Sequence, residues 1–179
     1  MSKQILILAA SPRRGGNSDL LCSAFAQGAA GAGHTVETVY LREKQIHYCT
    51  GCGACSEHGL PCPQKDDMPA ILEQMLSADV IVLATPVYFY TMNAQMKTLI
   101  DRTCSRYTEL KGKEFYFLLT AAEPDVKKME RTVESFRGFT ACLEDPVERG
   151  ILYGVGAWKI GDIQGMPILE EAREMGRQV

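Results

Sequence analysis

Four cysteines between residues 49 and 62 are the residues whose type and spacing point most directly to chemistry. Two residues separate Cys49 from Cys52 and Cys52 from Cys55, and six residues separate Cys55 from Cys62, which precedes a proline. Packing does not require this spacing, whereas a glycine-containing loop can fold such thiolates around one metal centre. The run approximates the bacterial ferredoxin pattern, so we expect these four cysteines to hold at most one [4Fe-4S] cluster.

Other interpretations of these cysteines remain open. Structural zinc sites use two separated Cys-x2-Cys pairs, and here the pairs overlap. His47 and His58 are alternative ligands, although a lone histidine in a loop is more often solvated. The remaining alternative is a loop whose thiols are free or bind zinc, or one whose cluster is lost to oxygen. Cys22, Cys104 and Cys142 fall on predicted helices and are expected to be core or surface thiols.

A polar segment, residues 11–18, follows the first apolar run of the chain. A strand, a short glycine-containing loop and a helix start in this order form an anion site, because free backbone N–H groups and the helix dipole converge there. Ser11, Asn17 and Ser18 can donate to a phosphate, and Arg13 adds positive charge. The loop is neither a dinucleotide fingerprint nor a nucleotide-triphosphate loop. The alternative is an ordinary capped turn.

A second segment, residues 85–93, follows another apolar run and contains three consecutive aromatic residues. Pro86 stiffens it, and Val87, Tyr88, Phe89 and Tyr90 offer an apolar surface suited to a planar ligand. The alternative is that these rings pack on the core or at a subunit contact.

Short apolar runs alternate with helical patterns, which predicts an α/β fold with a parallel sheet. Strands are expected at residues 3–9, 35–41, 80–84, 115–120 and 150–154, and helices at 18–32, 67–76, 94–105, 124–143 and 166–178. Residues 1–179 then form one doubly wound three-layer domain, with the cysteines on a loop insertion at about 44–66. With the flavodoxin-like order 2-1-3-4-5, a ligand binds between the ends of strands one and three.

Several motifs resemble one known family. S-P-R-x-x-G-N-S at 11–18, T-P-V-Y-x-Y at 85–90, M-K-x-x-I-D-R at 96–102 and the cysteine run are similar to those of NAD(P)H-dependent FMN reductases and iron–sulfur flavoproteins. The resemblance implies FMN, with its phosphate at 11–18 and its ring against 85–90. It also implies a homodimer or homotetramer in which a cluster lies near the FMN of a partner subunit. A third family segment follows the strand expected at 115–120 and here begins at Thr120, which the resemblance adds to the FMN contacts. This segment lacks the glycines common in the family.

The resemblance implies an oxidoreductase that passes electrons from NAD(P)H or a ferredoxin-like donor through FMN to a small-molecule or protein acceptor. No protein acid or base is required, so no catalytic residue is assigned. The alternatives are a non-catalytic electron carrier, an FMN reductase whose cysteine loop holds zinc or no metal, and a zinc-using hydrolase or regulatory module.

Composition argues against a nucleic-acid-binding protein, a membrane protein and a secreted protein. The chain has 179 residues and a net charge of −3, which argues against binding to nucleic acid. The apolar run at residues 5–10 is too short to span a membrane and is flanked unlike a signal peptide. We therefore expect a cytoplasmic protein without membrane association, in which structural disulfides are not expected.

Overall fold

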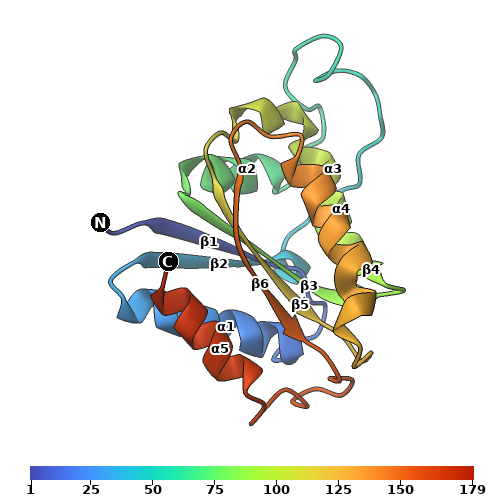
Figure 1. Ribbon diagram of the computed structural model, residues 1–179. Helices are drawn as coiled ribbons and strands as arrows, with labels where there is room; N and C mark the ends of the chain where they lie inside the picture. Colours follow the sequence, from blue (N-terminus) through green and yellow to red (C-terminus); the bar gives the residue numbers. More distant parts are fainter.

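The computed structural model describes all 179 residues, and its centre is a twisted parallel sheet (Figure 1). The parallel strands are β1 (Gln4–Ala9), β2 (Thr35–Tyr40), β3 (Val80–Tyr88), β5 (Glu114–Thr120) and β6 (Val147–Gly154). They lie in the order β2-β1-β3-β5-β6, and the two-residue strand β4 (Thr91–Met92) pairs with the end of β3 in the antiparallel sense. Apart from β4, this is the predicted order 2-1-3-4-5.

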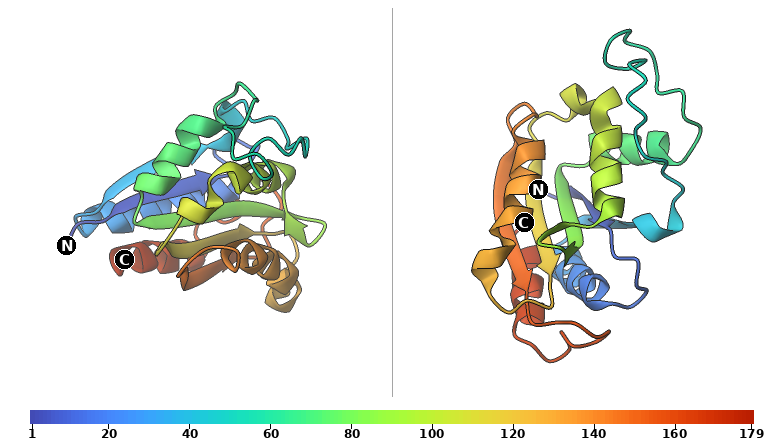
Figure 2. Two further views of the ribbon diagram at one scale, coloured as in Figure 1. Left: turned by 90° about the horizontal axis from the view of Figure 1, so that it is seen from above. Right: turned by 90° about the vertical axis from the view of Figure 1, so that its right-hand side faces the viewer.

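Helices cover both faces of the sheet. Helices α1 (Asn17–Gly31) and α5 (Ile168–Arg177) pack side by side on one face. Helices α2 (Met68–Ser77), α3 (Ala94–Arg102) and α4 (Glu130–Thr140) lie on the other, as the views in Figure 2 show. The segment between β2 and α2 extends away from these layers and contains the four closely spaced cysteines. None of the helices combines the length and the apolar character needed to cross a membrane.

The alternation of side chains along each strand explains the two layers. In β1, Ile5 and Ile7 belong to the apolar cluster beneath α1 and α5, whereas Leu6 and Leu8 belong to the cluster beneath α2, α3 and α4. All four are at most 2% exposed. Because both faces are covered, central strands consist of continuous apolar runs, and this is why the sequence pattern located them.

The boundaries of several elements differ from those predicted. Strand β3 continues to Tyr88 instead of ending at residue 84, because β5 pairs with it as far as Pro86 and β4 pairs with Val87 and Tyr88. The helix predicted at 124–143 is shorter: a 3-10 turn at Val126–Met129, capped by Asp125, precedes α4. The helix predicted at 94–105 ends at Arg102 and continues as a 3-10 turn.

Two glycines allow α1 and α5 to approach closely. A Cβ added to Gly28 would lie 1.9 Å from the carbonyl oxygen of Arg173, and one added to Gly176 would lie 2.1 Å from that of Phe25. Both distances are far inside van der Waals contact with backbone atoms, which cannot rotate away. Glycine is therefore required at both positions of this helix pair.

We predict that Gly28→Ala destabilises the fold by at least about 2 kcal/mol, because the methyl group forces the two helices apart. Gly138→Ala is the matched control: Gly138 lies in α4 with no atom within 4 Å of the added Cβ. Since alanine favours helix, that variant should gain up to about 1 kcal/mol. Urea unfolding followed by circular dichroism measures both, and equal effects of the two substitutions would contradict the packing argument.

Candidate functional site: a pocket at the carboxyl ends of the strands

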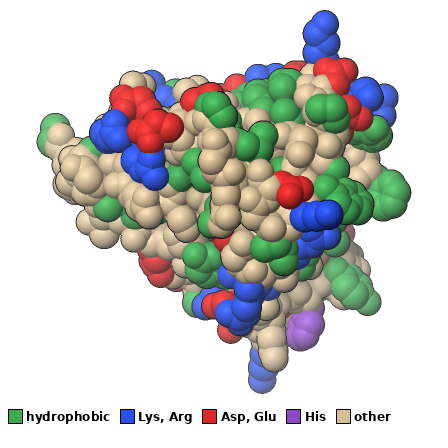
Figure 3. Space-filling model, turned by 90° about the horizontal axis from the view of Figure 1, so that it is seen from below, with side chains coloured by type: hydrophobic (Ala, Val, Ile, Leu, Met, Phe, Trp, Pro, Cys, Tyr) green, Lys and Arg blue, Asp and Glu red, His purple; other side chains and the backbone are tan.

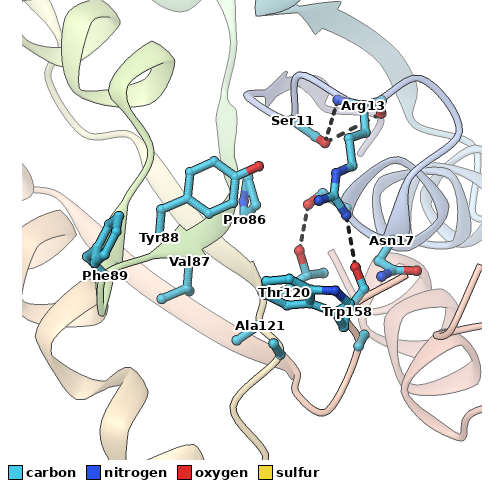
Figure 4. Close-up of a pocket in the computed structure, with 13 residues that line it drawn as sticks. Ser11, Arg13, Asn17, Pro86, Val87, Tyr88, Phe89, Thr120, Ala121 and Trp158 are labelled. Carbon is cyan, nitrogen blue, oxygen red and sulfur yellow. Dashed lines mark hydrogen bonds between the residues drawn. The ribbon is translucent and has the colours of Figure 1, made fainter. Parts of the chain in front are cut away.

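The carboxyl ends of β1, β3 and β5 open into a pocket of about 350 Å³, a volume within the range of small-ligand sites. The structure brings into this one pocket every predicted contact residue except Tyr90: Ser11, Arg13, Asn17, Ser18, Pro86, Val87, Tyr88, Phe89 and Thr120. Figure 4 shows Pro86, Val87 and Tyr88 on one side of it, and Arg13, Asn17 and Trp158 on the other.

The segment from Ser11 to Ser18 forms the polar end of the pocket. Gly16 stands at the N-cap of α1 without a capping side chain, and the first amides of a helix have no partner within it. The buried hydroxyl groups of Ser18 and Thr120 lie 2.6 Å apart. Hydroxyl groups, free amides and the N-terminal dipole of α1 therefore meet here, which is an arrangement that binds anions.

The loop after β6 closes this end, which sequence reasoning missed. The Arg13 guanidinium donates to the Trp158 carbonyl at 2.8 Å, and the Asn17 amide group donates to the Lys159 carbonyl at 2.9 Å. Asn17 Oδ1 in turn accepts from the backbone N–H groups of Gly161 and Ile163. The available signal was Trp158 itself, the single tryptophan of the chain, just beyond the last predicted strand.

A strained hairpin forms the aromatic wall, where the sequence pattern predicted only a loop. Phe89 and Tyr90 both have positive φ, 50° and 62°, between the paired residues Tyr88 and Thr91. Positive φ at both central residues is typical of a type I′ turn, a conformation that usually requires Gly or Asn. Phe89 is completely exposed, and the Tyr90 hydroxyl lies 3.3 Å from Glu123 Oε2, outside the pocket.

Asn93 holds this hairpin against the end of β1. Its side chain is buried, donates to the Ala10 carbonyl at 2.6 Å and accepts from the Met96 amide at the start of α3. The backbone N–H of Asn93 donates to Thr85 Oγ1 at 3.1 Å. Asn93 thus joins the end of β1, strand β3 and the start of α3, a role that residue type alone did not indicate.

The cysteine loop is separate from this pocket, and none of its four cysteines lines it. Cys49 and Cys52 are exposed, Cys55 and Cys62 are half-buried, and no disulfide joins any of them. The expected convergence of the four thiols is not present: no three His, Cys, Asp or Glu side chains come close enough to hold a metal ion. The backbone of Glu57 and Leu60 instead bonds to that of Gly53 and Ala54, which folds residues 53–60 into a turn of their own.

A buried ion pair anchors the base of this loop. The Arg102 guanidinium donates to both carboxylate oxygens of Asp66, at 2.5 and 3.1 Å, and the two side chains are almost fully buried. The same guanidinium donates to the His47 carbonyl at 2.7 Å and approaches Cys62 Sγ at 3.6 Å. Its buried Nε has no acceptor. The guanidinium therefore stands beside Cys62 through Nη2, and a positive group at this place fits an anionic sulfur centre.

Cys104 lies near this loop, although the sequence pattern assigned it no part there. It follows α3 and shares a surface hollow with Cys49. Its pKa is raised by burial and by the neighbouring thiols of Cys55 and Cys49. The order of residues along the chain does not reveal this proximity, because Cys104 comes from an element about 50 residues away.

Comparisons with known proteins show the family to which the chain belongs. The family model described as "NADPH-dependent FMN reductase" matches residues 4–145. The chain belongs to this family. It is therefore an FMN-dependent oxidoreductase of the flavodoxin-like type, as predicted from its motifs.

Relatives of this chain include proteins named for an iron–sulfur group. It is 40% identical over 172 residues to an iron–sulfur flavoprotein of Archaeoglobus fulgidus, a match that covers 94% of this chain and 75% of the relative. It is 39% identical over 100 residues to one from Methanocaldococcus jannaschii, covering 56% of this chain and 51% of the relative. Several such matches thus span about half the length of the relatives.

Solved structures share the fold of this chain. An NAD(P)H:quinone oxidoreductase from Methanothermobacter marburgensis superposes with a TM-score of 0.76 at 22% identity, over 99% of this chain and 97% of the other. An FMN-dependent NADH-azoreductase from Bacillus anthracis, determined in complex with FMN, superposes with a TM-score of 0.72 at 14% identity, over 99% of both chains.

The anchor of the cysteine loop makes stability depend on pH. Burial opposes ionisation of Asp66, but hydrogen bonds from Arg102, His47 and Met68 outweigh it and lower its pKa from 3.8 to about 2. Because the pKa is lower in the folded protein, the stabilisation is complete above about pH 4. We predict that about 2 kcal/mol is lost as the pH falls from 4 to 2.

Asp66→Asn should remove that pH dependence and cost about 3 kcal/mol at pH 7, because Arg102 is left buried without its counter-charge. Asp101→Asn removes a carboxylate from the exposed pair with Lys97 and should change stability by less than about 0.5 kcal/mol. Urea unfolding at several pH values tests this. If Asp66→Asn still loses the same free energy of unfolding between pH 4 and 2, another group causes the pH dependence.

Proposed function

We propose that the pocket holds FMN and that the protein passes electrons from NAD(P)H, or from a ferredoxin-like protein donor, through FMN to an acceptor. The observation that carries this proposal is the junction of an anion-binding helix start with an aromatic wall in one pocket. Phosphate and ring of one FMN molecule match these two ends. Bound FMN would supply the exchange of one or two electrons, and the protein supplies binding and orientation.

The polar end binds the phosphate in this proposal. Ser11, Ser18 and Thr120 offer hydroxyl groups, and Arg13 brings a charge that no acidic side chain neutralises. Because Arg13 is bonded to the Trp158 carbonyl, the charge is held in place before any ligand arrives, which lowers the entropy cost of binding.

The apolar end holds the ring. Pro86, Val87 and Tyr88 face the pocket from β3, and their rigid backbone fixes the depth at which a planar group enters. Around the opening, Phe89 and Trp158 remain 100% and 68% exposed. Figure 3 shows several hydrophobic side chains at the surface on this side. We propose that a second copy of the chain covers them in a homodimer or homotetramer.

Protein loaded with FMN should lose its absorbance near 450 nm within seconds of anaerobic mixing with NADPH or NADH. Thr120→Val removes one pocket hydroxyl at constant volume and should require roughly tenfold more FMN for the same bleaching, since one hydrogen bond to a charged group is worth about 1.5 kcal/mol. Stopped-flow absorbance across an FMN titration measures both.

Thr132→Val is the matched control, because Thr132 is buried in α4 with a hydroxyl that has no partner. It should bind FMN like the unaltered protein. Bleaching by a reduced ferredoxin but not by NADPH or NADH would identify an electron carrier, and failure to bind FMN would refute the proposal.

We further propose that Cys49, Cys52, Cys55 and Cys62 bind one [4Fe-4S] cluster. Their spacing, the names of the relatives and the Arg102 guanidinium beside Cys62 support it. Glycines at positions 51, 53 and 59 have positive φ, so this loop can adopt backbone conformations that bring the thiolates together. A bound cluster would supply one-electron transfer.

Anaerobically purified protein should contain about four irons per chain. Cys62→Ser should lose most of them, whereas Cys104→Ser, at the neighbouring thiol outside the run, should retain them. Iron and zinc analysis of both variants measures this. Retention in Cys62→Ser with loss in Cys104→Ser would move the fourth ligand to Cys104, and zinc or no metal in the unaltered protein would refute the cluster.

A further inference from the structure

An acidic residue stands in the helix turn that would receive the FMN phosphate. Asp19 occupies the first turn of α1 and is only 6% exposed. Its Oδ2 accepts from the Gly15 amide at 2.9 Å, which closes the loop on itself. A carboxylate in a first helical turn stabilises the helix, but it repels a second anion at the same place.

Arg42 reaches this carboxylate from behind the phosphate loop. It lies in the 3-10 turn just after β2, and its Nη1 is 3.0 Å from Asp19 Oδ1. The same Nη1 donates to the Ser11 carbonyl at 3.2 Å, so one nitrogen joins the first residue of the loop to the helix that follows. The guanidinium also lies over the Tyr40 ring, 4.3 Å from its centroid. Neither Asp19 nor Arg42 lines the pocket.

The Arg42–Asp19 pair is buried, and one of its hydrogen-bond donors has no acceptor. The side chains of Arg42 and Asp19 are 12% and 9% exposed, and Arg42 Nε is buried without an acceptor. An unpaired buried N–H costs free energy, and an apolar pair of similar volume would avoid that cost. The effect of the carboxylate extends to Cys22, one turn further along α1, whose pKa is raised by burial and by Asp19. The negative charge of Asp19 therefore acts on groups in the first turns of α1, and Arg42 is the cation paired with it.

We propose that Arg42 is a positioning residue that neutralises Asp19 and so makes the start of α1 able to accept a dianionic phosphate. Asp19 shapes the loop through Gly15, and Arg42 removes the repulsion that this shaping would otherwise cause. With the pair intact, Arg13 remains as a positive charge without an acidic partner. The selectivity of the pocket for FMN over riboflavin, which lacks the phosphate, then depends on a residue outside the pocket. This inference rests on the proposed FMN site.

The test compares the dissociation constants of FMN and riboflavin, measured by flavin fluorescence quenching. Arg42→Gln should raise the dissociation constant of FMN at least tenfold and that of riboflavin less than twofold. In the double variant with Asp19→Asn, the dissociation constant of FMN should return to within about threefold of that of the unaltered protein. The reason is that the amide oxygen introduced at position 19 still accepts from Gly15 and neither side chain of the pair is charged. Lys44→Gln, which removes a neighbouring exposed positive charge, is the matched control and should change neither constant.

Equal weakening of FMN and riboflavin in Arg42→Gln would overturn the inference, since it would indicate a structural role alone. If that variant does not fold, Asp19→Asn decides: the inference predicts FMN binding at least as tight as in the unaltered protein, and tenfold weaker binding would refute it. Failure of the unaltered protein to prefer FMN over riboflavin would instead refute the proposed phosphate site.

Discussion

The parallel pairing of β1 with β3 determines where the phosphate loop and the aromatic wall of the candidate site lie relative to each other. The register joins Ala9 to Ala84, and the Ala10 amide continues the pairing by donating to the Ala84 carbonyl. Beyond this point the chain after β1 turns to α1 on one face, while the chain after β3 turns to α3 on the other. The two connections leave a crevice between them, which is where doubly wound sheets bind ligands. Asn93 secures the crevice because its buried amide group bonds to the Ala10 carbonyl.

Two buried arginine–aspartate pairs hold the irregular segments of this protein to its regular core. Arg42 joins the phosphate loop to α1 through Asp19, and Arg102 joins the cysteine loop to α3 through Asp66. In both pairs the arginine Nε is buried without an acceptor. Such pairs add little net stability compared with apolar residues, but losing one partner is costly. Their contribution is to fix the loops in one position, which a binding site requires.

The hairpin after β3 stores strain at the mouth of the pocket. Two bulky residues in the left-handed region cost a few kcal/mol together, and the full exposure of Phe89 returns no burial energy. The pairing of Val87 with Met92 and the buried hydrogen bonds of Asn93 keep the turn in place. Strain of this kind concentrates at functional sites, where it presents side chains that a relaxed loop would not hold outward.

The amino-acid sequence by itself determined the sheet, the strand order and most of the pocket. Continuous apolar runs identify strands buried on both faces, and the topology then brings together the segments that follow β1, β3 and β5. Tertiary structure alone decided the rest. Trp158, Asn93, Arg42 and Cys104 act through partners 20 or more residues away or through a surface shared with distant segments, and no periodicity records such contacts. The same reason explains why the cysteine spacing predicted a ligand set but not its geometry: spacing specifies which thiols lie on one loop, whereas backbone turns and the Asp66–Arg102 anchor decide where each thiol points.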